Sequence, residues 1–116
     1  NMDHSLPLTP GEILEFGDAK NNKEHFEYIR SYAPYDNIEK KDYPNILITT
    51  SLSDSRVLFD EPTKYCAKLR DYKTDDNLLL FKCEMDAGHG SRTGRKNIIE
   101  DIAFDYAFAL KIANKI

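Results

Sequence analysis

The sequence predicts an α/β protein with a short parallel sheet, flanking helices and a long C-terminal helix. Two continuous runs of apolar, β-favouring residues, 45–50 and 78–83, are separated by a segment whose apolar side chains have helical spacing. Strands without polar alternation are typical of parallel sheets that helices cover. Strand, helix and strand in this order form a βαβ unit, whose crossover is almost always right-handed.

Two short helices are expected before the first strand. An apolar cluster at 13–16 follows Thr9 and Pro10, and these suit a helix start because threonine caps helices and proline fits their first turn. Residues 22–32 also place apolar side chains at helical spacing, and the turn-forming residues 33–37 end that segment.

The remaining helices are expected at 60–72 and at about 97–116. Asp60 is a candidate N-cap of the first, and Pro62 fits its first turn. The last helix carries two apolar stripes, one of Ile99, Ile102, Ala103, Tyr106, Leu110 and Ala113 and one of Phe104, Phe108 and Ile112. Because a surface helix usually has one stripe, the second predicts packing against something beyond the short sheet.

Composition bounds the class of protein. The chain has 116 residues, 41% hydrophobic and 31% charged, which suits one small globular domain. It has no apolar run of transmembrane length and no signal peptide, so we expect no membrane partner. The net charge of −4 without a basic stripe argues against nucleic acid. Cys66 and Cys83 are expected to be reduced thiols in a cytoplasmic protein, and to be buried as small hydrophobic residues.

Two loops at the carboxyl ends of the predicted strands are candidates for chemistry. The loop 51–57 carries Asp54, and the loop 84–91 carries His89 between two glycines. In open parallel sheets ligands bind at this edge, and the crossover brings the two loops together. An aspartate that orients a histidine is part of the nucleophile, base and orienter arrangement of hydrolases.

No serine in the sequence completes that arrangement. A strand-to-helix nucleophile elbow needs the pattern G-x-S-x-G, and Ser91 lacks it because Gly94 is three residues away. Asp86 and His89 have a spacing that could contact a metal, but no recognised metal motif surrounds them. We therefore expect no metal and no cofactor.

Seven short motifs occur in one order along nearly the whole chain: 5–9, 11–12 with 16–17, 31–37, 54–57, 61–62 with 64, 67–70, and 87–90 with 94–95. Together they resemble the C-terminal end of the oligopeptidase B group in the prolyl oligopeptidase family of serine peptidases. The resemblance implies an α/β-hydrolase catalytic domain preceded by a β-propeller that admits only short peptides. Residues 1–116 would then be the C-terminal segment of that catalytic domain, without the propeller or the serine-bearing half.

The resemblance also implies roles for individual residues. Asp54 matches the triad aspartate and His89 the triad histidine. Arg56 matches an arginine that contacts the substrate backbone. Glu12 matches one of two carboxylates that bind the basic side chain before the cut bond, and the second falls at Leu14.

From the residues alone, simpler interpretations stay open. Asp54 fits a loop or capping residue, His89 a turn residue, and Glu12 a charge that stabilises a helix start. Three basic residues near the end of the chain fit a solvated loop, namely Arg92, Arg95 and Lys96.

Two functions follow from different classes. The first is a serine peptidase segment that supplies Asp54 and His89 and acts on short peptides, after basic residues, once the missing half is present. The second is an inactive truncated gene product that acts, if at all, by association with another chain. In either case the unpaired edge of strand 46–50 and the helix 97–116 predict a homo-oligomer.

Overall fold

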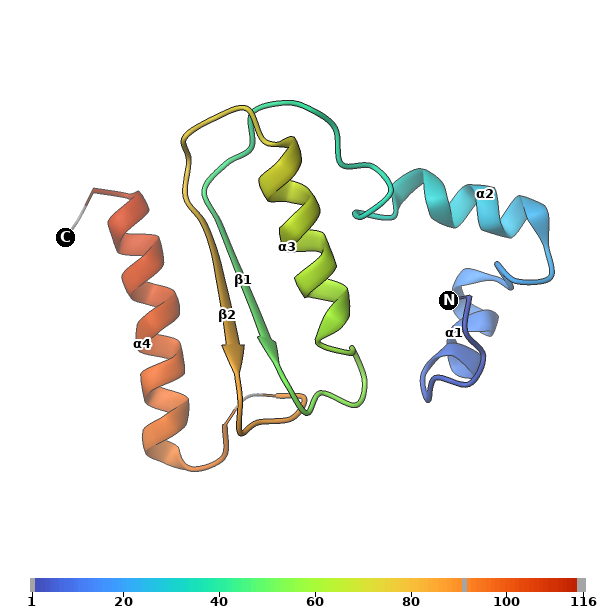
Figure 1. The fold of residues 1–116 in the computed structure, drawn as a ribbon. Helices are drawn as coiled ribbons and strands as arrows, with labels where there is room; N and C mark the ends of the chain where they lie inside the picture. Colours follow the sequence, from blue (N-terminus) through green and yellow to red (C-terminus); the bar gives the residue numbers. More distant parts are fainter. Residues whose placement is uncertain (1, 91, 115–116) are drawn as a thin grey trace. The chain divides into compact units, whose positions relative to one another are not determined.

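The computed structural model describes residues 2–90 and 92–114, and the chain forms two compact units, Asn1–Lys40 and Lys41–Ile116 (Figure 1). The first unit contains α1 (Thr9–Phe16) and α2 (Lys23–Tyr32). The second contains β1 (Ile46–Ser51), α3 (Asp60–Tyr72), β2 (Leu79–Glu84) and α4 (Arg95–Ile112). The predicted order of elements is confirmed.

In the first unit, local contacts set the turn between α1 and α2. Gly17 follows α1 with φ 103°, and a Cβ at this position would lie 2.9 Å from the His25 ring. Nδ1 of that ring accepts a hydrogen bond from the backbone N–H of Asp18 at 3.0 Å. Asn22 then caps α2 by accepting hydrogen bonds from the backbone N–H groups of Glu24 and His25. Glycine is needed at 17 because a side chain would displace the ring.

Two predicted N-caps are wrong. Thr9 is already helical and buried, and the N-cap position of α1 is Leu8. Asp60 likewise lies inside α3, whose N-cap position is Phe59, and its carboxylate instead binds Lys64 Nζ at 2.6 Å. A capping side chain works from a residue with extended backbone angles. Leu8 and Phe59 both have helical angles, because each helix continues directly from a turn.

The second unit is built on the predicted parallel pair. β1 and β2 are aligned along their whole length, ending with Ser51 opposite Glu84. Figure 1 shows the strands between α3 and α4, and α3 packs on both strands. Cys66 and Leu69 of α3 are buried, and Leu69 is fully so. The sequence predicts strands buried on both faces, but within β1 only Ser51 is buried, and Cys83 of β2 is half-buried.

The two apolar stripes of α4 differ in how far the rest of the chain covers them. The Phe104 ring lies 4.7 Å from Lys82 Nζ of β2, and Phe108 and Ile112 are half-buried. The other stripe is open to solvent, with Ile102 49% and Tyr106 67% exposed. The stripe that lacks cover is therefore the one that includes Ile102 and Tyr106.

The bounds of α4 also differ slightly from the prediction. The helix begins two residues earlier than expected, after Gly94 with φ 96°, and ends at Ile112. The last two residues of the predicted helix lie outside the described part of the chain. Across residues 2–90 and 92–114, the helices are too short or too polar to cross a membrane.

Candidate active site

Asp54 lies in a turn that directly follows β1. Its Oδ1 accepts hydrogen bonds from the backbone N–H groups of Arg56 at 2.9 Å and Val57 at 3.0 Å. These bonds, that of Val57 first, lower the pKa of the Asp54 carboxyl below its usual value, and the contact with His89 adds to the effect. The Asp54 side chain is 12% exposed, so an ionised carboxylate is held in a partly enclosed position.

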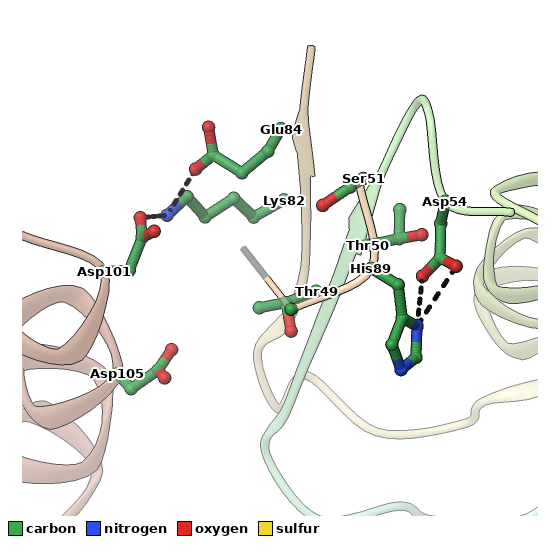
Figure 2. A pocket seen from close by; sticks show the side chains of 10 residues that line it. Thr49, Thr50, Ser51, Asp54, Lys82, Glu84, His89, Asp101 and Asp105 are labelled. Atoms are coloured by element: carbon green, nitrogen blue, oxygen red, sulfur yellow. Dashed lines mark hydrogen bonds and ion pairs between the residues drawn. The ribbon is translucent and has the colours of Figure 1, made fainter. Parts of the chain in front are cut away.

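His89 follows β2 and meets this carboxylate, as the sequence predicts. Its Nδ1 lies 2.9 Å from Oδ2 and 3.1 Å from Oδ1 of Asp54 (Figure 2). An ionised carboxylate can only accept hydrogen bonds, so Nδ1 carries the proton of the neutral ring. Nε2, on the far side of the ring, then keeps a lone pair that can accept a proton.

Backbone contacts bring the two loops together. The N–H of Leu52 donates to the carbonyl of Glu84 at 2.8 Å, and that of Ser53 donates to Ala87 at 3.1 Å. A Cβ at position 88 would lie 3.4 Å from the Ser53 carbonyl oxygen, an ordinary van der Waals distance, so the two loops run close together here. Two backbone hydrogen bonds therefore hold the loops side by side just past the strands.

The pair borders a cavity of about 180 Å³ between the sheet and α4. Figure 2 shows the carboxylates of Asp101 and Asp105 on the α4 side and His89 on the loop side. No three His, Cys, Asp or Glu side chains among the described residues are grouped as a metal site. The lining residues are Thr49, Thr50, Ser51, Asp54, Lys82, Glu84, His89, Gly90, Asp101 and Asp105.

The other predicted site residues have different settings. The side chain of Arg56 is exposed, two residues after Asp54. Glu12 lies in the first turn of α1 in the first unit and is half-buried, and Leu14 is 93% exposed. Ser91 lies outside the described residues.

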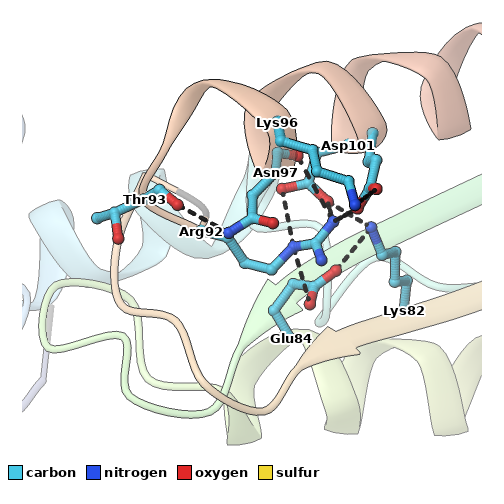
Figure 3. Close-up of polar contacts among 8 residues, drawn as sticks. Lys82, Glu84, Arg92, Thr93, Lys96, Asn97 and Asp101 are labelled. Carbon is cyan, nitrogen blue, oxygen red and sulfur yellow. Dashed lines mark hydrogen bonds and ion pairs between the residues drawn. The ribbon is translucent and has the colours of Figure 1, made fainter.

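Sequence reasoning missed a cluster of charges behind the His89 loop, which we call the ion network: Lys82, Glu84, Arg92 and Asp101 (Figure 3). Lys82 Nζ lies 2.7 Å from Glu84 Oε1 and 2.9 Å from Asp101 Oδ1. Arg92 Nη2 lies 2.8 Å from the same Asp101 oxygen, and Arg92 Nε lies 3.6 Å from Glu84 Oε2. The interpretation of Arg92 as a solvated loop charge is therefore wrong.

The members of the ion network stabilise one another's charged forms. Hydrogen bonds from Arg92 and then Lys82 lower the pKa of Asp101 to about 2. The pKa of Lys82 is raised, first by Glu84 and then by Asp101. A sequence signal existed, because Lys82 and Glu84 lie two residues apart in an otherwise apolar strand and so share one face.

Comparison with known proteins identifies the class of protein that this fold and site define. The family model "Prolyl oligopeptidase family" matches residues 1–115, and the chain belongs to this family of serine peptidases. A curated relative, Protease 2 of Moraxella lacunata, is 48% identical over 109 residues, 94% of this chain. Dipeptidyl aminopeptidase BI of Pseudoxanthomonas mexicana is 40% identical over the same share of the chain.

Solved structures agree with the fold. Oligopeptidase B from Leishmania major matches 97% of this chain at 39% identity, with a TM-score of 0.92. Oligopeptidase B from Trypanosoma brucei, solved with covalently bound antipain, gives a TM-score of 0.91 at 41% identity. The α/β-hydrolase fold class and the resemblance to oligopeptidase B are thus confirmed. The chain spans 16% of Protease 2 and 16% of each oligopeptidase B chain, and 15% of the aminopeptidase.

Proposed function

We propose that this chain supplies the general base and its orienting carboxylate to a serine peptidase of the oligopeptidase B type. The observation that carries the proposal is the contact of His89 Nδ1 with Asp54 Oδ2 at 2.9 Å, at the carboxyl edge of two parallel strands. Family membership and the likeness to two oligopeptidase B structures support it.

In the complete enzyme, the oxygen of a serine hydroxyl attacks the peptide carbonyl, and His89 Nε2 takes the proton of that hydroxyl. His89 then gives this proton to the leaving amine. In the second half of the reaction, water attacks the acyl group while His89 takes a proton from the water, and His89 then returns this proton to the serine oxygen. Asp54 holds the Nδ1–H and stabilises the imidazolium between these steps. Because residues 1–116 contain no G-x-S-x-G pattern, the serine is proposed to come from outside them.

The proposed substrates are short peptides, cut after a basic residue. Glu12 would pair with the basic side chain, and Arg56 would contact the peptide backbone. Leu14 cannot serve as the second carboxylate, so the preference for arginine and lysine should be weaker than with two acidic partners. The cytoplasmic location stays a prediction of the sequence.

A chimaera tests the proposal. This chain replaces the matching segment of Protease 2 from Moraxella lacunata, which is 48% identical to it. The chimaera should hydrolyse fluorogenic peptides with Arg before the reporter, and faster than the matched peptides with Ala. His89→Ala and Asp54→Asn should each lower kcat by about 10⁴-fold, because base and tautomer are lost. The 116-residue chain alone should show no turnover.

Asp86→Asn is the matched control, since Asp86 is an exposed carboxylate three residues before His89. It should leave kcat nearly unchanged. Full turnover in the His89→Ala chimaera would show that another residue is the base.

The alternative function, association of an inactive chain with another chain, is favoured by one observation. Ile99 and Tyr106 on α4 are 55% and 67% exposed, which leaves an apolar face uncovered. An inactive chimaera that is folded, together with self-association of the isolated chain, would support this alternative.

A further inference from the structure

The charged face of β2 is unusual for a strand that packs between two helices. Lys82 and Glu84 point to the α4 side, and their side chains are only 26% and 21% exposed. Charges in such a position are costly unless they are paired and hydrogen-bonded. Here each is paired within the ion network, so the contacts of that network decide how β2 meets α4.

Residues of the ion network also lie at both ends of the segment that carries His89. Residues 85–94 run from the end of β2 to the start of α4, with His89 in the middle. Glu84 precedes this segment, Arg92 lies near its end, and Asp101 lies on α4 beyond it. The Arg92 guanidinium contacts both Glu84 and Asp101, and it also lies 3.5 Å from the Asn97 carbonyl oxygen. One side chain therefore connects the two ends of the segment.

We propose that Arg92 is a positioning residue, which holds segment 85–94 so that His89 Nδ1 meets the Asp54 carboxylate. The other end of the segment is fixed by the hydrogen bond from Ser53 N–H to the Ala87 carbonyl. A planar guanidinium suits this role because its donors form a rigid fork, whereas the ammonium group of a lysine is a single point charge on a flexible stem. This inference rests on the proposed function of the Asp54–His89 pair.

The tautomer of His89 provides a direct test in the isolated chain. Two-bond ¹⁵N–¹H correlation spectra above neutral pH should show His89 protonated at Nδ1. His25 serves as an internal contrast, because its Nδ1 accepts a hydrogen bond from Asp18 and must be unprotonated. Arg92→Met should abolish the Nδ1-protonated signature of His89 and leave His25 unchanged.

Amide exchange gives a second readout. Loss of Arg92 should speed exchange of the Ser53 amide about tenfold, because its acceptor lies in the released segment. The Ile46 amide, bonded to Leu78 at the opposite end of the sheet, should not change. A general loss of stability would speed both amides, so the contrast separates positioning from folding.

Three further variants complete the design. Lys96→Met removes a cation that is 88% exposed and lies 3.8 Å from Glu100, and it should leave both readouts unchanged. Arg92→Lys should restore the readouts only in part. Asp101→Asn removes the carboxylate that Arg92 shares with Lys82, and it should give the same changes as Arg92→Met. It replaces Arg92→Met in the experiment if the Arg92→Met protein does not fold.

The outcomes separate this inference from the proposed function. Suppose that His89 is protonated at Nδ1 in the wild type. If Arg92→Met and Asp101→Asn both keep that signature and leave Ser53 exchange unchanged, Arg92 has no positioning role. If the wild type lacks the signature, or Asp54→Asn leaves it intact, the Asp54–His89 pair itself is refuted. Ser53 exchange then shows only whether Arg92 holds the segment that carries Ala87.

Discussion

Asp75 fixes the chain just before the two strands begin. Its Oδ2 accepts the backbone N–H of Tyr43 at 2.6 Å, and its Oδ1 accepts that of Asn77 at 2.8 Å. Lys73 Nζ lies 2.7 Å from Oδ1. The bond from Lys73, followed by those from the backbone, lowers the pKa of Asp75 to about 2. One charged group thus links the segments that precede β1 and β2.

Asp75→Asn should lower the melting temperature at neutral pH by several degrees. A depressed folded-state pKa adds stability above the ordinary value of 3.8, and this is lost as the pH falls through about 2. The difference between wild type and variant should therefore be full above pH 4 and shrink toward pH 2. Thermal unfolding followed by circular dichroism across that range measures it. A difference independent of pH would mean that the charge of Asp75 is not the cause.

At the same scale, the sequence predicts the Asp54–His89 pair but not the ion network. The pair follows from topology, because two parallel strands deliver their following loops to one edge. The network depends on which rotamers bring Arg92 to Asp101, nine residues later, and no periodic pattern encodes that choice. The charged pair at 82 and 84 was the available signal.

Among the elements, α3 connects the two strands and supplies the core. Its predicted range, 60–72, is the observed one, and both strands are predicted within one residue of their observed ends. Apolar periodicity fixes such elements well, since burial drives both the pattern and the packing. Helix caps are less predictable because they depend on backbone angles outside the helix, as Leu8 and Phe59 show.

A pair of leucine substitutions tests where the core lies. Leu69→Ala should lower the free energy of unfolding by roughly 2–5 kcal/mol, because Leu69 is fully buried. Leu14→Ala removes the same atoms from a side chain that is 93% exposed, and it should change the free energy of unfolding by less than about 0.5 kcal/mol. Urea unfolding measures both. Equal effects of the two substitutions would contradict this description of the core.

For the whole molecule, uncovered apolar surface is the main consequence of the fold. The exposed stripe of α4 includes Ile99, Ile102 and Tyr106. Covering such side chains gains about 25 cal/mol per Å² of apolar surface, so three of them represent a few kcal/mol. That is a large fraction of the stability of a small domain.

We therefore expect the isolated chain to self-associate at tens of micromolar concentrations. Light scattering after size exclusion should give a mass above the 13.4 kDa of one chain. Ile102→Glu with Tyr106→Lys should weaken the assembly, because both residues lie on the exposed stripe. An assembly that resists this pair of changes would place the contact at the edge of β1 instead. A stable monomer would contradict the expectation.

The parallel register has a further consequence during synthesis. Each residue of β1 pairs with one 33 positions later, as Ile46 does with Leu79. At ribosomal rates of about 5–20 residues per second, β1 leaves the ribosome roughly 2–7 s before its partner. The β1–β2 pairing cannot form during that interval, while α3 can already form from local contacts. The edge of β1 that pairs with β2 therefore has to stay available until the second strand has been made.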